Sequence, residues 1–136
     1  MSPQKQADLR AFIDSCDHAV VSYLSDDGTP QSAVVAIAVS SELEIIFDTV
    51  DSSRKYRNLK TRPHCSVTVW KGEKTVQYEG VAEEARIAHR EVYFQKLPDG
   101  RVRLKWPGIA YFVVRPKWIR YSDYDARPPL IEQYTF

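Results

Sequence analysis

Cysteine is scarce in this sequence, with only Cys16 and Cys65 among 136 residues. Two thiols, together with a polar start at Met1–Gln6 in place of an apolar leader, predict reduced cysteines in a cytoplasmic protein. No apolar run approaches the roughly 20 residues that a membrane-spanning helix needs, so we expect no membrane segment. An excess of one charge is also missing, because Lys and Arg total 19 and Asp and Glu 18. This balance argues against nucleic acid as a partner.

The remaining composition is typical of a compact, soluble domain. Hydrophobic residues make up 43% of the chain and charged residues 27%, a balance that excludes a disordered chain. A chain of this length buries roughly 68% of its unfolded surface, which is enough for one core without disulfides or metal ions. We therefore expect a single domain over residues 1–136.

Hydrophobic periodicity predicts a mainly β fold of the α+β class. An amphipathic helix is expected over Gln4–Cys16, and shorter helices over 51–60, with Asp51 or Ser52 as its N-cap, and over 87–97. Strands are expected over 19–24, 32–39, 43–48, 65–70, 75–84 and 109–114. Six antiparallel strands with peripheral short helices indicate a small β-barrel, because barrel closure removes unpaired strand edges.

Two details of the strands bear on how the barrel is built. The segment 32–39 is an almost continuous run of Ala, Val and Ile, as expected of a strand buried on both faces. Short turns join it to the strands before and after, so these three strands should form an antiparallel meander. Gly80, in the middle of a predicted strand, indicates a bulge that lets the sheet curl.

The strongest chemical signal is a run of positive charge between Ser52 and Gly72. The run contains no acidic residue and six basic ones, namely Arg54, Lys55, Arg57, Lys60, Arg62 and Lys71. Arg54 and Lys55 fall in the first turn of a predicted helix, where the helix already carries about half a positive charge. Two cations there cost stability unless an anion joins them, and free N–H groups with the Ser52 and Ser53 hydroxyls would complete a phosphate site. The alternative is a solvated basic helix face, and the pattern alone does not separate the two.

No other pattern in the sequence defines a catalytic site. The three histidines have no partners at metal-ligand spacing, so no metal site is predicted. His64 and Cys65 are neighbours on a predicted strand and should point to opposite faces, which argues against a Cys/His nucleophile pair. Phosphate-binding glycine loops and the nucleophile motif Gly-x-Ser-x-Gly are missing. Asp123, Asp125 and Glu132 are typical of a solubilising acidic tail.

A series of short motifs, in fixed order between about His18 and Glu84, resembles a known family. The motifs are Gly28-Thr29-Pro30, Phe47-Asp48-Thr49, Ser53-Arg54-Lys55 with Asn58-Leu59, a Pro63-x-x-Ser-Val strand and Val76-Gln77-Tyr78-Glu79-Gly80. The tail Arg115-Pro116-x-Trp-x-Arg-Tyr-Ser-Asp also resembles the end of the family's short members. The family is that of the pyridoxamine 5'-phosphate oxidase-like proteins, the FMN-binding split β-barrels, and Ser53-Arg54-Lys55 is its most specific motif here.

The resemblance implies a homodimer with two FMN sites at the subunit interface. By the family's pattern, Arg54 and Lys55, which follow Ser53, would grip the flavin phosphate. Thr49 matches a position that contacts the cofactor, and Thr75 a position near the ring system. The strand from Ala33 to Ala38 would run along the isoalloxazine and offer it backbone groups. The flavin would supply the redox chemistry and the protein the positioning and electrostatics.

Two departures from the family pattern shape the predicted function. The true oxidases carry an Arg and a Lys where this sequence has Ala33 and Ala38, and they have a longer C-terminal region that binds substrate. The resemblance therefore implies an FMN-dependent oxidoreductase of unidentified small-molecule substrate rather than a vitamin B6 oxidase. Two alternatives stay open: a related barrel that binds a deazaflavin or, less in keeping with the scattered histidines, haem; and a non-catalytic, stress-linked flavin-binding module.

Overall fold

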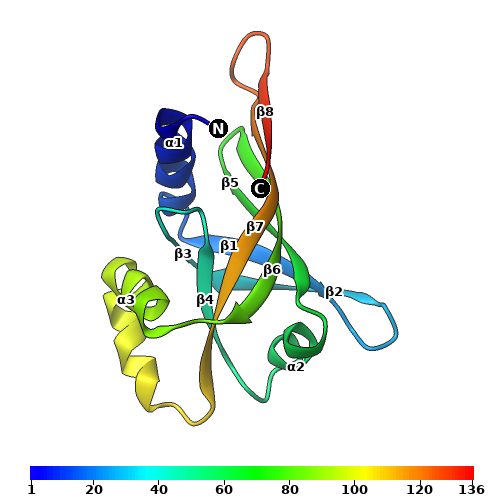
Figure 1. The fold of residues 1–136 in the computed structure, drawn as a ribbon, viewed down its shortest axis with the longest axis vertical. Helices are drawn as coiled ribbons and strands as arrows, with labels where there is room; N and C mark the ends of the chain where they lie inside the picture. Colours follow the sequence, from blue (N-terminus) through cyan, green and yellow to red (C-terminus); the bar gives the residue numbers. More distant parts are fainter.

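The chain forms one curled antiparallel sheet with helices around it (Figure 1). The computed structural model describes residues 1–136. The helices are α1 (Pro3–Asp14), α2 (Arg54–Thr61), α3 (Ile87–Lys96) and a 3-10 segment η1 (Pro98–Lys105). The strands are β1 (His18–Leu24), β2 (Pro30–Ala36), β3 (Ala38–Val39), β4 (Ile45–Val50), β5 (His64–Lys71), β6 (Lys74–Glu84), β7 (Ile109–Asp123) and β8 (Leu130–Thr135).

The sheet closes on itself through one segment of chain. Its strand order is β2-β1-β5-β6-β7-β4-β3, with β8 paired to β7. The two ends of this order, β2 and β3, are consecutive in sequence and separated only by Ile37, so the segment 30–39 pairs with β1 at one end and β4 at the other. The predicted meander and the split β-barrel are confirmed.

The predicted strand count of six was too low, because the sheet has eight strands. The expected strand 32–39 divides at Ile37, where the chain passes from one edge of the sheet to the other. Residues 130–135 form β8, where no strand was predicted. The strand expected over 109–114 continues to Asp123, because it passes Pro116 at the bulge opposite Gly80. The bulge predicted at Gly80 is confirmed by a register shift between Glu79 and Gly80.

The expectation that the segment 32–39 is buried on both faces was wrong for β2. Its side chains alternate from Pro30 to Val35 between exposed and partly or fully buried, and Val34 is 68% exposed. Since β2 pairs only with β1, one of its edges and one of its faces are free. Packing of the barrel core does not account for the exposed apolar side chains of β2, and exposed apolar patches of this kind are typical of interaction surfaces.

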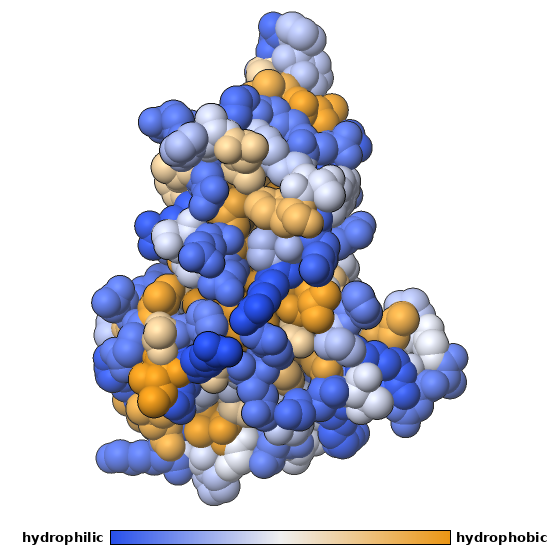
Figure 2. Space-filling model, viewed as in Figure 1, coloured by the Kyte–Doolittle hydropathy of each residue, from blue (hydrophilic) through white to orange (hydrophobic).

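Two hydrophobic clusters hold the fold together. The larger one has 22 buried residues and fills the barrel, with Leu9 and Ile13 of α1 and Leu59 of α2 closing it from the side. The smaller one lies outside the barrel, where Tyr93 and Phe94 of α3 cover the far face of β4 and β7. Figure 2 shows apolar side chains gathered on the surface over α3 and η1, a region that includes the exposed Ile87, Val102 and Leu104. None of the helices is long and apolar enough to cross a membrane.

Candidate functional site

The first part of the site is the N-terminus of α2, where the chain leaves β4. Ser53, not Asp51 or Ser52 as predicted, is the N-cap: its Oγ accepts a hydrogen bond from the Tyr56 N–H at 3.1 Å. The same Oγ lies 2.9 Å from Oγ1 of Thr49, which is buried near the end of β4. The helix therefore begins one residue later than Ser52 would allow, and Arg54 and Lys55 occupy its first two positions. Thr49, Ser53, Arg54 and Lys55 are thus brought together, as the sequence predicted.

Arg54 and Lys55 are cations of α2 without a partner in the chain, whereas Arg57 donates a hydrogen bond to the carbonyl oxygen of Ser52. The helix has no acidic residue in its first turn, and neither side chain has an ion-pair partner within 4.0 Å. By contrast, Lys60 pairs with Glu84 at 3.1 Å and Arg62 with Asp26 at 2.9 Å. The backbone N–H groups of Arg54 and Lys55 also donate to no acceptor in the chain. Two free N–H groups and two cations without partners at a helix N-terminus are the groups that favour an anion.

The two cations occupy different surroundings. Arg54 lines a shallow polar hollow of about 640 Å³ between α2 and the β1–β2 hairpin, together with Arg57, Asn58 and Gln31. Lys55 is half-buried, and desolvation lowers the pKa of its ammonium while the Asp48 carboxylate opposes that change. Asp48 itself is already held by Arg103, whose Nε donates to Oδ2 at 2.7 Å. Lys55 is therefore a desolvated cation, and Asp48, the carboxylate that stabilises its charge, is engaged by Arg103, which favours binding of an anion from solution.

The second part of the site is the outer face of the sheet around Thr75, at the start of β6. Thr75 lies opposite Trp70 of β5 and Ser122 of β7, and Ser122 lies opposite Ile131 of β8. Directly opposed residues share one face of a sheet, so these four side chains form a row across four strands. Trp70 is 54% exposed and Ile131 43%, which leaves a partly apolar surface beside Thr75.

Two buried polar atoms on this outer face lack hydrogen bonds. They are Oγ of Ser122 and Nε of Arg120, which lies opposite Gln77 of β6. Buried polar atoms without partners are rare in folded proteins, because each costs free energy. The face beside Thr75 therefore combines exposed apolar surface with two buried polar groups that have no hydrogen-bond partner within one chain.

One copy of the chain does not bring Thr75 to the N-terminus of α2. Tyr56 of α2 donates a hydrogen bond to Glu84 at the far end of β6. Nine residues along the strand separate Glu84 from Thr75, a path of roughly 30 Å. Figure 1 shows the same separation, with α2 and the β5–β6 hairpin at opposite ends of the barrel. A single ligand could contact both parts only where two copies of the chain meet.

Several other residues considered in the sequence analysis lie outside the candidate site. Cys65 is buried and His64 exposed, so they face opposite sides of β5 as predicted, and burial raises the pKa of the Cys65 thiol to about 12. Glu132 does not belong to a solvated acidic tail: it lies in β8, forms an ion pair with Lys5 and accepts a hydrogen bond from Tyr134. No three His, Cys, Asp or Glu side chains come together in a group that could hold a metal ion.

Sequence reasoning missed Asp48 and Arg103 as neighbours of the anion site. They are 55 residues apart, and η1, which carries Arg103, was not predicted. Asp48 was noted only as part of the motif Phe47-Asp48-Thr49, and that motif was used to predict a cofactor contact for Thr49, with no role for the Asp48 carboxylate.

The closed antiparallel barrel, with two unpartnered cations at the first helix after its fourth strand, defines the fold as a split barrel. The family model described as "Pyridoxamine 5'-phosphate oxidase" matches residues 6–123. The chain belongs to this family. The resemblance found in the sequence is thereby confirmed.

Individual proteins show how much of the chain is similar in sequence or in structure. A pyridoxine/pyridoxamine 5'-phosphate oxidase of Thermosynechococcus vestitus is 27% identical over 110 residues, which cover 79% of this chain and 50% of that protein. The chain thus spans about half the length of the curated relative it matches. Among solved structures, a heme binding protein from Mycobacterium smegmatis has a TM-score of 0.80 at 18% identity, covering 99% of this chain and 58% of that one.

Two further solved structures match nearly the full length of both chains. General Stress Protein 26 from Bacillus anthracis has a TM-score of 0.74 at 18% identity, covering 95% of this chain and 98% of that one. A pyridoxamine 5'-phosphate oxidase-related, FMN binding protein from Nostoc punctiforme has a TM-score of 0.70 at 9% identity, covering 100% and 98%. At such identities these similarities define the fold.

Proposed function

We propose that this protein binds FMN as a homodimer, with one cofactor at each of two equivalent sites between the subunits, and acts as an FMN-dependent oxidoreductase on a small molecule. The observation that carries the proposal is the pair of uncompensated cations, Arg54 and Lys55, beside two free N–H groups at the N-terminus of α2. A phosphate monoester is the ligand that this arrangement favours. Membership of the family and the FMN-binding relative from Nostoc punctiforme support FMN as the compound that carries the phosphate.

Each site residue has a distinct task in this proposal. Arg54 and Lys55 bind the phosphate, and the linked hydroxyls of Thr49 and Ser53 keep the N-terminus of α2 in place beneath it. Thr75, with the exposed Trp70 opposite it on β5, provides the surface for the ring system from the partner subunit. Bound FMN would supply hydride or electron transfer, and the chain supplies binding, orientation and exclusion of water.

The free surfaces of the barrel support the homodimer. The open face of β2, with Val34 68% exposed, and the face around Trp70 and Thr75 belong to the same outer side of the sheet, since β2, β1, β5 and β6 are neighbours in it. Val34 lies opposite Val20, which lies opposite Thr68 of β5. A second copy of the chain would cover this apolar side and bring its own Thr75 toward α2.

The substrate proposed is not a vitamin B6 phosphate. Ala33 and Ala38 stand where the oxidases carry cations, and Ala38 is only 1% exposed beneath α3. No positive charge replaces them in β2 or β3. A substrate phosphate would therefore find no partner there, and an uncharged or differently charged substrate is favoured.

Replacing both cations tests the phosphate assignment. In the double variant Arg54→Ala, Lys55→Ala, FMN affinity should fall at least about tenfold, because each charge-assisted hydrogen bond to phosphate contributes roughly 1.5–3 kcal/mol. Affinity is measured by quenching of flavin fluorescence. The matched control is Arg10→Ala, Arg127→Ala, which removes two positive charges without ion-pair partners from α1 and the β7–β8 loop. Unchanged FMN affinity in the first variant would refute the phosphate site.

Reduction of the bound flavin separates the enzyme from a non-catalytic flavin-binding module. With FMN bound, anaerobic addition of reduced nicotinamide cofactors should bleach the flavin spectrum faster than with free FMN. Retention of FMN without any accelerated reduction by a panel of donors would support the binding module instead. Sedimentation analysis of the same sample should show a dimer, and a monomer that binds FMN would contradict the shared site.

A further inference from the structure

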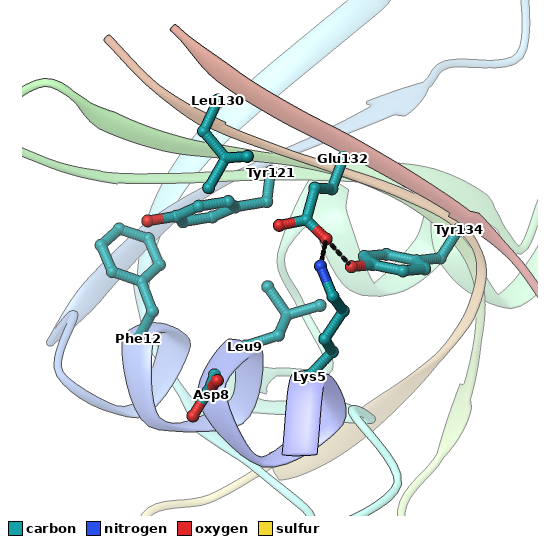
Figure 3. Close-up of a pocket in the computed structure, with 8 residues that line it drawn as sticks. All are labelled: Lys5, Asp8, Leu9, Phe12, Tyr121, Leu130, Glu132 and Tyr134. Atoms are coloured by element: carbon teal, nitrogen blue, oxygen red, sulfur yellow. Dashed lines mark hydrogen bonds and ion pairs between the residues drawn. The ribbon is translucent and has the colours of Figure 1, made fainter. Parts of the chain in front are cut away.

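A separate cavity lies between α1 and the hairpin formed by β7 and β8. It has a volume of about 260 Å³, and Figure 3 shows its side chains arranged around an open centre. It is lined by Lys5, Asp8, Leu9, Phe12, Tyr121, Leu130, Glu132 and Tyr134. Tyr121 lies opposite Val76 of the core, on the side of the sheet away from Thr75. The cavity is therefore distinct from the proposed flavin site.

One side of the cavity is apolar and firmly built. Leu9 is 5% exposed and belongs to the main core. Phe12 and Tyr121 meet edge to face, with ring centroids 5.6 Å apart and an interplanar angle of 75°. Leu130, 44% exposed, stands at the mouth. These groups form an aromatic and aliphatic wall against which a hydrocarbon body can pack.

The other side of the cavity presents a carboxylate with unused capacity. Oε2 of Glu132 accepts hydrogen bonds from both Lys5 Nζ and Tyr134 OH, the latter at 2.5 Å. Oε1 accepts none within the chain and points toward the open centre (Figure 3). The bond from Lys5, followed by that from Tyr134, lowers the pKa of Glu132, which keeps it ionised at neutral pH. A carboxylate can accept about four hydrogen bonds, so Oε1 remains available.

The charges around the cavity select the sign of a ligand. Lys5 forms an ion pair with Glu132, and Asp8, whose Oδ1 accepts a hydrogen bond from Gln4 at 2.8 Å, adds a second carboxylate among the lining residues. The lining residues therefore carry a net charge of −1, which disfavours an anion, while a neutral donor would gain less from Oε1 than a charged one. The cavity is also smaller than the roughly 300–1,000 Å³ typical of sites for drug-sized ligands, which excludes a flavin-sized occupant.

From these observations we propose that the cavity binds a small primary ammonium compound with an aromatic body. Its ammonium group donates to Oε1 of Glu132, and its ring packs against Leu9, Phe12 and Tyr121. The amine is a ligand here, and no bond is made or broken. The proposal does not depend on FMN binding, so failure of one proposal would leave the other unaffected.

Titration of the protein with 2-phenylethylamine tests the proposal. Binding is followed by protein NMR, and calorimetry provides a second measurement of affinity. The expected result is saturable binding, with shifts concentrated at Leu9, Phe12 and Leu130. The neutral analogue 2-phenylethanol and the anion 3-phenylpropionate have similar bodies, and both should bind at least about fivefold more weakly. Equal binding of the alcohol and the amine would overturn the proposed role of the carboxylate, and shifts spread evenly over the surface would overturn the site.

Two variants in the cavity and one control variant make the test specific. Glu132→Gln keeps the shape of the side chain and removes its charge, so amine affinity should fall about tenfold or more. Glu91→Gln, at an exposed position on α3, removes the same charge elsewhere and should leave affinity unchanged. Leu130→Trp changes an exposed side chain at the mouth and should block entry while the fold is retained. Full amine affinity in Glu132→Gln, or in a folded Leu130→Trp, would contradict the proposal.

Discussion

Arg103 of η1 and Asp48 of β4 form an ion pair at 2.7 Å between Nε and Oδ2, and this pair lies beside Lys55. Arg103 also donates to Tyr93 OH at 3.2 Å, which anchors η1 to α3. Both charged side chains are largely shielded from solvent, with 27% and 17% exposure. Because Arg103 occupies Asp48, the carboxylate is prevented from capturing the ammonium that the proposed FMN phosphate needs.

Arg103→Ala should therefore weaken FMN binding without touching FMN directly. Asp48, freed from its partner, would attract Lys55 and compete with the phosphate, and a partly exposed ion pair of this kind is worth up to about 1 kcal/mol, or about fivefold in affinity. Riboflavin, which lacks the phosphate, should bind equally well to both proteins. The control is Arg101→Ala, which removes the same charge from the same segment. Equal losses of FMN and riboflavin affinity would point to a general structural defect instead.

FMN affinity should also fall as the pH rises through the alkaline range. Burial lowers the pKa of Lys55 below the ordinary lysine value, so its ammonium loses its proton at a lower pH than an exposed lysine would. Only the charged form binds phosphate, and affinity is therefore full below that pKa and declines above it. Lys55→Arg keeps its charge and should show a flatter profile. Affinities for FMN and riboflavin are measured by fluorescence at each pH. Their ratio removes the effect of proton loss from the ring system, which both ligands share.

Tyr78 of β6 links the turn between β3 and β4 to β7 through its hydroxyl, inside the barrel. The OH lies 2.8 Å from the carbonyl oxygens of both Leu43 and Val114, and the side chain is 1% exposed. Tyr78→Phe should lower the free energy of unfolding by about 1–3 kcal/mol, because it leaves buried acceptors without a donor. Tyr124→Phe, at a 44% exposed position, should change it by about 0.5 kcal/mol or less. Urea denaturation measures both, and equal stabilities would contradict this role for Tyr78.

Gly80 is required at the bulge because there is no room for a side chain. A Cβ atom there would lie 2.4 Å from the Arg115 carbonyl oxygen and 2.7 Å from Cγ1 of Val114. Gly80→Ala should destabilise the protein by about 1–3 kcal/mol, as overpacking does elsewhere. Glu79→Ala, at the exposed neighbouring position, should change stability by about 0.5 kcal/mol or less. A Gly80→Ala protein with the thermal midpoint of the parent would show that the bulge can shift.

The parts of the fold that could be predicted are those whose signals are local. Alternating patterns revealed β5 and β6, and the glycine at position 80 revealed the bulge. The exposed face of β2 could not be predicted, because an apolar run such as 32–39 has the same pattern whether the barrel core or a second molecule covers it. β8 was missed because its closing contacts, among them Glu132 with Lys5, join opposite ends of the chain.

In the candidate site, too, residues with local sequence signals could be predicted and residues joined by long-range contacts could not. Arg54 and Lys55 could be placed at a helix N-terminus from charge and capping alone, although the N-cap proved to be Ser53. The pairing of Asp48 with Arg103 depends on where η1 packs, which no periodicity in 98–105 reveals. Thr75 could be named only through the family resemblance, since its distance from α2 within one chain hides any local relation to the phosphate site.

The most direct test of FMN binding is the visible absorbance spectrum of the purified protein after incubation with FMN and desalting. FMN bands should be retained in a stoichiometric amount, and the double variant Arg54→Ala, Lys55→Ala should lose them. A well-folded protein that emerges colourless would contradict FMN binding, and binding of a deazaflavin or haem under the same conditions would reassign the site to that cofactor.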